Sequence, residues 1–199
     1  MMTDILRTTT TAGKFVIQTF KIVRLVAIVA LTTLTVLACG SSDSATPPAR
    51  VIDDDRIFSL EDLRAAGMKA SKQYDVSDLP GAVDAWYGFM RAAAGPKDVE
   101  VRFYASHAYA VALGTELADE ASGDDALVDE ETATWIEGVK DRVRLSSGGT
   151  ADLAAWSGQR VPNYADFVIF GNMILLCQGD EPQQSLDLCH ELIDALNAP

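Results

Sequence analysis

The chain has 199 residues, of which 48% are hydrophobic and 23% are charged, close to the averages of a soluble globular domain. The 29 Asp and Glu residues outnumber the 16 Lys and Arg residues, which gives a formal charge of −13. Nucleic-acid binding needs a clustered basic face, so DNA and RNA are not expected as partners. With 14 Gly and 7 Pro, the composition also excludes collagen-like, coiled-coil and broadly disordered chains.

Residues 1–38 have the pattern of an export signal. They contain four basic residues and one acid, which are Arg7, Lys14, Lys21, Arg24 and Asp4. An uncharged apolar run then extends from Leu25 to Ala38. A basic region followed by an apolar region predicts a signal peptide. The alternative is an uncleaved membrane anchor, because an apolar run of about 14 to 18 residues is near the lower limit for crossing a bilayer.

The apolar run ends in Val36-Leu37-Ala38-Cys39-Gly40, with a small residue before the cysteine and a polar stretch after it. This segment resembles the lipobox of bacterial lipoproteins. The resemblance implies that the Cys39 thiol carries a diacylglyceryl group and that a signal peptidase cuts before Cys39. It also implies a protein held by acyl chains in the cell membrane or outer membrane, with its folded part outside the cytoplasm. Two or more acyl chains anchor a protein stably without a transmembrane helix.

Residues 39–57 are expected to be the lipidated cysteine and a disordered tether, because Ser, Asp and the pair Pro47-Pro48 have little to bury. A single domain is expected over residues 58–199, with an insertion at 123–163. From Cys39 onward the chain has 12 basic and 28 acidic residues, a formal charge of −16. The domain should therefore be soluble, and its repulsion from anionic lipid headgroups should hold it off the membrane surface on its tether, without direct docking.

In addition to Cys39, the chain has two cysteines, Cys177 and Cys189. An even number of further cysteines in an exported chain favours one disulfide bond. The alternatives are two buried free thiols and a redox or metal-binding pair. The sequence contains no CxxC motif or Cys/His cluster that supports a redox or metal pair.

The first half of the domain is expected to contain a short helix, a hairpin and a longer helix. Ser59 followed by Asp62 predicts a helix start, and Gly67 predicts its end. Residues 69–76 can form an edge strand. Residues 83–89 fit a strand or a helix; the strand is preferred because residues 99–104 alternate after a Gly-Pro turn and can pair with it. A helix is expected from residue 106 to about 121, with a buried stripe at Tyr109, Leu113, Leu117 and Ala121.

The second half is expected to begin with a helix around residues 131–143 and a Ser-Gly-rich loop over 146–162. Residues 166–170 and 173–177 flank Gly171-Asn172, which predicts a hairpin with a two-residue turn. Because both strands are apolar on both faces, they should be central in the sheet. Pro182 predicts the start of a helix that continues to about Leu196.

The order hairpin, helix, insertion, hairpin, helix gives a ββα-ββα pattern. This pattern predicts an α+β fold with an antiparallel sheet of about four strands from two β-hairpins. Both long helices are expected to pack on one face of that sheet. The short N-terminal helix and the helical insertion complete the predicted domain.

Motifs that carry chemistry are scarce. The sequence has no G-x-S-x-G, no G-x-x-x-x-G-K, no G-x-G-x-x-G and no H-E-x-x-H. His107 and His190 lie far apart in the sequence, and structural or solvent roles are expected for both. The acidic run over residues 124–131 lacks the alternating ligands and turn glycine of an EF-hand loop. No catalytic residue, cofactor or metal is therefore expected.

The aromatic residues of the first predicted hairpin suggest a contact surface. Trp86 and Tyr104, with Arg102 beside them, are the candidates for an exposed patch that binds a ligand or partner. The alternative is that other segments cover these side chains. A carboxylate enzyme is a second hypothesis, in which Glu100 or Glu116 acts as acid or base if burial raises its pKa.

The segments Tyr74-Asp75-Val76, Tyr87-Gly88-Phe89 and residues 101–107 are similar to uncharacterised small bacterial lipoproteins. This similarity implies no activity. The sequence therefore predicts a lipid-anchored binding or protein-interaction module outside the cytoplasm, with an envelope protein or a small ligand as partner. An envelope hydrolase or carbohydrate-active enzyme is the alternative function.

Overall fold

The computed structural model describes residues 48–93, 95–145 and 160–198. The predicted signal peptide, Cys39, residues 40–47 of the predicted tether and residues 146–159 of the Ser-Gly-rich loop lie outside the described residues. The elements, in chain order, are β1 (Val51–Ile52), α2 (Leu60–Ala65), β2 (Lys69–Gln73), β3 (Ala82–Ala92), β4 (Gly95–Tyr104), α3 (His107–Tyr109), η2 (Ala110–Gly114), α4 (Thr115–Glu120), β5 (Val143–Leu145), β6 (Arg160–Pro162), β7 (Tyr164–Phe170), β8 (Met173–Gln178) and α5 (Pro182–Leu196).

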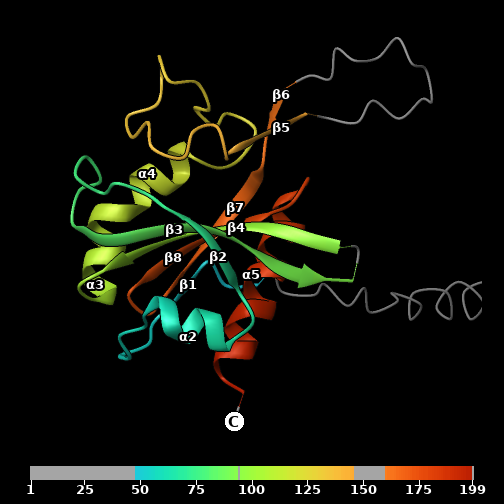
Figure 1. The fold of residues 1–199 in the computed structure, drawn as a ribbon. Coiled ribbons are helices and arrows are strands. Elements are labelled where there is room, and N and C mark those ends of the chain that lie inside the picture. Colours follow the sequence, from blue (N-terminus) through green and yellow to red (C-terminus); the bar gives the residue numbers. More distant parts are fainter. Residues whose placement is uncertain (1–47, 94, 146–159, 199) are drawn as a thin grey trace, which may run out of the picture. The chain divides into compact units, whose positions relative to one another are not determined.

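The main sheet has six strands in the order β1-β7-β8-β4-β3-β2 (Figure 1). Both predicted hairpins are present, as β3–β4 and β7–β8, and they join through an antiparallel pairing of β4 with β8. The α+β class is therefore confirmed, but the prediction of about four strands is wrong. The strand β2 adds to the edge of the first hairpin, and β1 pairs in parallel with β7 at the other edge. A second, two-stranded sheet consists of β5 and β6.

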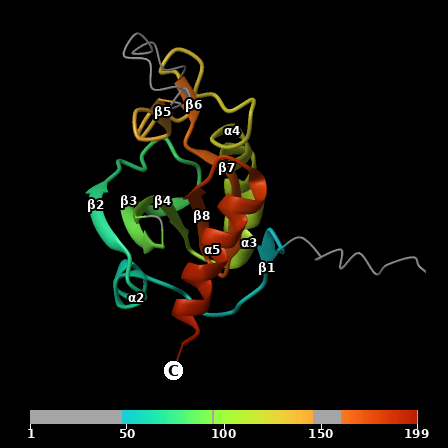
Figure 2. The same ribbon diagram turned by 90° about the vertical axis from the view of Figure 1, so that its right-hand side faces the viewer.

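Helices cover both faces of the main sheet (Figures 1 and 2). On the α5 face, side chains from α2 and α5 pack against Val99, Val101 and Leu175. On the α4 face, Ala110 and Ala118 pack against Ile174 and neighbouring side chains of β7 and β8. The prediction that both long helices share one face is wrong, because the central strands carry apolar side chains on both sides and both sides must be covered.

The short helix α2 forms where the sequence predicts it. The Ser59 backbone N–H donates to the Asp62 carboxylate over 2.8 Å, which completes a capping box at the start of the helix. Leu60 and Leu63 are buried against the α5 face. Gly67 follows the helix with a φ of 101°, a conformation that favours glycine and ends the helix.

The predicted helix over residues 106–121 is present but contains a π-helical turn, η2. Ser106 caps it by accepting from the Tyr109 backbone N–H. The π turn adds a residue and moves the buried stripe, so Ala110 and Gly114 face the sheet. Tyr109 and Leu113, which were expected in that stripe, are 53% and 38% exposed.

Residues 121–142 form turns where the sequence predicts a helix over residues 131–143. We call residues 121–142 the cover segment, because part of it packs over the α4 face. Trp135 and Val139 are its buried apolar side chains. Trp135 packs edge-on against Tyr74, with ring centroids 5.8 Å apart. The cover segment then leads into β5.

The second predicted hairpin and the last helix are confirmed. Gly171 adopts a φ of 53° in the β7–β8 turn. All residues of β8 except its last are buried, which agrees with the expected central position. Cys177 on β8 and Cys189 on α5 form a disulfide with Cα atoms 5.6 Å apart, as predicted. This bond joins the helix to a central strand.

Residues 49–58, which we call the arm, lie against the edge of the domain although most of them fall in the predicted tether. Val51 pairs with Ile169 in the β1–β7 ladder. The Arg50 guanidinium forms ion pairs with Asp119 and Asp166, at 2.8 and 2.9 Å. Phe58 ends the arm as a buried aromatic residue of the α5 face. The ordered part of the chain therefore begins before Phe58.

Candidate functional site

The structure separates the three residues predicted to form a contact patch. Trp86 is half-buried and packs on the α5 face, whereas Arg102 and Tyr104 are fully buried on the α4 face. Contrary to the prediction, Arg102 and Tyr104 are not available to a partner. The reason is that β4 lies inside the sheet, between β8 and β3, and is covered on both faces.

Arg102 instead belongs to a buried ion network. The Glu100 carboxylate accepts from Arg102 Nε over 2.8 Å and from Arg142 Nε over 2.8 Å. Both guanidiniums lie over the Trp135 ring, at 4.9 and 4.5 Å from its centroid. Arg142 comes from the cover segment, so the network connects that segment to the sheet.

The candidate carboxylates of the enzyme hypothesis are in different surroundings. Burial alone raises the pKa of Glu100, but the charges of Arg142 and Arg102 outweigh it and hold the pKa below its ordinary value. A carboxylate that stays ionised in this way is a poor general acid at neutral pH. Glu116 is exposed on α4 and is not part of the network.

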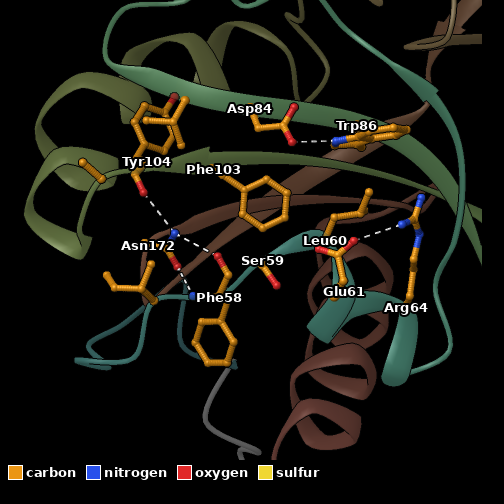
Figure 3. Close-up of a pocket in the computed structure, with 13 residues that line it drawn as sticks. Phe58, Ser59, Leu60, Glu61, Arg64, Asp84, Trp86, Phe103, Tyr104 and Asn172 are labelled. Atoms are coloured by element: carbon orange, nitrogen blue, oxygen red, sulfur yellow. Dashed lines mark hydrogen bonds and ion pairs between the residues drawn. The ribbon is translucent and has the colours of Figure 1, made fainter.

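Trp86 lines a groove of about 500 Å³ between α2 and β3 on the α5 face. We call it the Trp86 groove. Figure 3 shows Asp84 and Trp86 on one wall, Phe103 between the walls, and the residues of α2 on the other wall. Its apolar lining consists of Ile57, Phe58, Leu60, Val83, Trp86 and Phe103.

Polar interactions fix the orientation of Trp86. The indole Nε1 donates to Asp84 Oδ2 over 2.8 Å, and Gln73 Nε2 donates to the other oxygen, Oδ1, over 2.9 Å. From the opposite wall, the Arg64 guanidinium lies 5.7 Å from the Trp86 ring centroid and pairs with Glu61 over 3.2 Å. The groove thus has an aromatic side chain held in place, with charged groups of both signs around it (Figure 3).

Asn172 closes the far end of the Trp86 groove. Its Oδ1 accepts from the Phe58 backbone N–H over 2.7 Å, and its Nδ2 donates to the carbonyl oxygens of Phe58 and Tyr104 over 3.2 and 3.0 Å. One amide side chain therefore connects the arm, the β7–β8 turn and the end of β4. Tyr104 contributes to the groove at this end, although its side chain is buried.

This arrangement suits binding better than proton transfer. The two groove carboxylates, Asp84 and Glu61, already accept hydrogen bonds from neighbouring side chains. The rings and the charged groups can instead hold a ligand that combines an apolar face with polar edges. Within the described ranges, no group of three or more His, Cys, Asp and Glu side chains is arranged to hold a metal ion.

The histidines have the kind of contacts expected from the sequence. His107 Nδ1 is 2.8 Å from the Gly171 carbonyl oxygen, and His190 Nε2 is 3.0 Å from the Ala49 carbonyl oxygen. Both contacts hold backbone segments together.

None of the helices in the described part of the chain has the length and hydrophobicity needed to span a bilayer.

The sequence names Trp86 as a candidate contact residue but does not indicate the side chains that surround it in the groove. Arg64 and Asp84 come from separate elements, and only the fold shows that they meet. Asn172 was noted for its place in a tight turn, yet its side chain makes the more important contacts. The alternation of Glu100 and Arg102 with apolar residues resembles a solvent-exposed face, and Arg142 lies 42 positions from Glu100. The pairing of Arg142 with Glu100 leaves no pattern in the sequence around either residue.

Comparison with known protein families gives a match for the folded part of the chain. A family of unknown function, DUF6810, matches residues 59–198, which include the ion network, the disulfide and the Trp86 groove except Ile57 and Phe58. No curated protein and no solved structure matches the chain. Because the match extends over more than half of its length, the chain belongs to the DUF6810 family.

Proposed function

We propose that this protein is a lipid-anchored binding module outside the cytoplasm and that its ligand site is the Trp86 groove. The ligand is a small molecule or a terminal residue with an apolar ring face and hydrogen-bonding edges, such as a pyranose sugar. The observation that carries this proposal is the orientation of Trp86, which Asp84 fixes in the groove opposite Arg64.

Two features of the chain support the anchor. The sequence Val36-Leu37-Ala38-Cys39-Gly40 follows an uncharged apolar run and a basic region. The two cysteines of the domain, Cys177 and Cys189, are within disulfide distance, and disulfides persist in oxidising compartments outside the cytoplasm. Cys39 is thereby left as the cysteine that can carry the acyl chains.

The groove chemistry supports a sugar-like ligand. A pyranose ring has an apolar face of C–H groups that packs on an aromatic ring, and its hydroxyl groups both donate and accept hydrogen bonds. The groove supplies the half-buried ring of Trp86, with Asp84 and Glu61 as acceptors and Arg64 as donor. A largely apolar site with a few placed polar groups is the usual composition of small-ligand sites.

A hydrolase is the second candidate, because two carboxylates, Glu61 and Asp84, line one groove. Glycosidases use such pairs on either side of the scissile bond. Binding without cleavage is favoured here, since Asp84 is held by Gln73 and Trp86 and Glu61 is paired with Arg64. Both roles place the ligand in the same groove.

Titration of residues 40–199 with the trisaccharide of N-acetylglucosamine tests the groove. Calorimetry should detect binding that Trp86→Ala abolishes. The matched control is Tyr109→Ala, which removes an aromatic side chain that is 53% exposed outside the groove and should leave the affinity unchanged. Equal binding by wild type and Trp86→Ala, or no binding at all, would reject the ligand class. Release of shorter sugars during incubation would favour the hydrolase.

Labelling of cells with an alkyne fatty acid tests the anchor separately. The wild-type chain should become labelled and lose the mass of residues 1–38, whereas Cys39→Ala should remain unlabelled. The control variant Cys177→Ala should still be labelled, because that cysteine belongs to the disulfide. An unlabelled wild-type chain that keeps its leader would contradict the anchor without affecting the groove.

A further inference from the structure

The β3–β4 hairpin extends beyond both of its neighbours in the sheet. It is paired as far as Ala92 and Gly95, whereas the pairing of β2 with β3 stops at Phe89 and the pairing of β8 with β4 stops at Val99. We call the part beyond these positions the hairpin tip. Figure 1 shows it projecting from the sheet, away from α3 and α4.

A pocket of about 810 Å³ lies at the base of the hairpin tip. Apolar side chains form much of its lining, and two basic side chains border it. The residues that matter for the argument are Lys69, Phe89, Met90, Arg91, Ala92 and Pro96. Arg91 and Pro96 are exposed, whereas Met90 packs into the cluster of the α5 face. The pocket therefore joins a projecting basic surface to the apolar interior.

The charges are distributed unevenly over the domain. Nine of the 12 basic residues after Cys39 form ion pairs with Asp or Glu in the described residues. The three for which the described residues provide no ion pair are Lys69, Arg91 and Lys97, and all lie at the hairpin tip or beside it. No acidic residue occurs between Asp84 and Asp98. Lys69 and Arg91 border the pocket, whereas Lys97 is opposite Met90 in the hairpin register, so the cations without an ion pair among the described residues flank the tip on both of its faces.

We propose that the hairpin tip docks on an anionic membrane surface, with the three cations on lipid phosphates and the apolar lining against the acyl boundary. Basic side chains around an apolar surface are the combination that binds anionic interfaces. The choice of a membrane rests on the proposed lipid anchor, which holds the domain beside one. Pro48 lies nine positions after Cys39, and an extended segment of that length spans at most about 30 Å.

A second copy of the chain is a less suitable partner. The formal charge of −16 from Cys39 onward opposes the approach of a second copy and of an anionic membrane alike, but the proposed acyl anchor holds only the membrane within reach of the tip. A free phosphate would satisfy the cations but not the apolar lining of the pocket. Binding of a second copy and binding of free phosphate would each give a result different from membrane binding in the following experiment.

The test uses residues 40–199, which contain all three buried clusters of the domain and lack the acylation site. Flotation compares vesicles of phosphatidylcholine with vesicles that contain about one-third phosphatidylglycerol, an anionic lipid. The variant combines Lys69→Gln, Arg91→Gln and Lys97→Gln. The control combines Lys72→Gln, Lys140→Gln and Arg160→Gln, which remove the same charges from exposed residues that have ion-pair partners.

The wild type and the control should bind the anionic vesicles, and the tip variant should bind at least about tenfold more weakly, since each cation near an anionic surface contributes severalfold. Equal loss in both triple variants, or equal binding to neutral vesicles, would overturn the proposal. So would competition by soluble glycerol phosphate, which indicates a small-anion site, or self-association that only the tip variant loses, which indicates a second copy.

A substitution in the apolar part provides an independent measurement. Ala93→Asp places a carboxylate at an exposed position of the tip and leaves all three cations in place. It should weaken vesicle binding as the triple variant does, whereas Ala112→Asp on η2 should not. Trp86→Ala should bind vesicles normally, so a failure of the tip is distinguishable from a failure of the groove or the anchor.

Discussion

On the α5 face, β4 contributes Val99, Val101 and Phe103 to an apolar cluster, whereas on the α4 face the same strand contributes Glu100 and Arg102 to a buried ion network. The difference follows from what covers each face. A regular helix such as α5 satisfies its own backbone and needs only apolar contact. The turns of the cover segment leave carbonyl groups unpaired, and burial makes such groups costly.

The guanidiniums supply the missing donors on the α4 face. Arg142 donates to the carbonyl oxygens of Trp135 and Glu137, and Arg102 donates to that of Leu117. Glu100 balances one of the two positive charges, and the Trp135 ring lies against both. Charged side chains thus take the place of regular secondary structure in holding this cover on the sheet.

Removal of Glu100 should produce the largest effect. Glu100→Ala leaves two buried guanidiniums without a counter-charge, which should lower the free energy of unfolding by about 3 to 5 kcal/mol. Urea denaturation measures this change. The control Glu116→Ala, at an exposed position of α4, should change it by less than about 0.5 kcal/mol. Similar values for the two variants would mean that the network contributes little.

Removal of the disulfide should lower the stability of the α5 face. The double variant Cys177→Ala and Cys189→Ala opens a link between residues 12 positions apart and should cost about 3 kcal/mol in the chain-entropy account. Hydrogen exchange should accelerate in α5 more than in the cover segment. Equal acceleration on both faces would show that the two covers unfold as one unit.

A smaller effect is expected where the π turn meets the sheet. A Cβ atom at Gly114 would overlap the side chains of Ile174 and Tyr104. Gly114→Ala should therefore lower the free energy of unfolding by about 1 to 3 kcal/mol through overpacking. Val111→Ala, at a partly exposed position of the same turn, is the control and should be nearly neutral. Thermal denaturation compares the two variants.

Acid should weaken the α4 face selectively. The two guanidiniums lower the pKa of Glu100 from its ordinary value of 4.5, so the folded state binds this proton more weakly than the unfolded state. The stability that this carboxylate confers is therefore complete above pH 4.5 and declines as the pH falls toward the lowered pKa. Glu100→Gln should flatten that part of the profile. An unchanged profile in this variant would assign the acid sensitivity to other groups.

Local patterns predicted the elements that depend on local chemistry. The capping box of α2, the turn at Gly171 and the start of α5 at Pro182 were all visible in the sequence and are present in the structure. The disulfide followed from the export signal and the cysteine count. Each of these features involves residues that are close in sequence or chemically distinctive.

The remaining features depend on contacts between distant segments. The side of the sheet on which each helix packs is decided by long-range packing, and β1 has too few residues for a strand pattern. The burial of Arg102 was not visible in the sequence, because Arg142, which shares the Glu100 carboxylate with it, lies in a segment without periodicity. Nothing in the sequence indicated the Trp86 groove beyond Trp86 itself, since its opposite walls come from α2 and β3.

The contacts of Asn172 also determine where the independently folding unit begins. The DUF6810 match starts at residue 59, yet Asn172 bonds both backbone groups of Phe58, and Phe58 itself fills part of the core. A chain truncated at the family boundary would lose this aromatic side chain and uncover the outer edge of β7. The autonomous domain is therefore longer than the segment that defines the family and includes the arm.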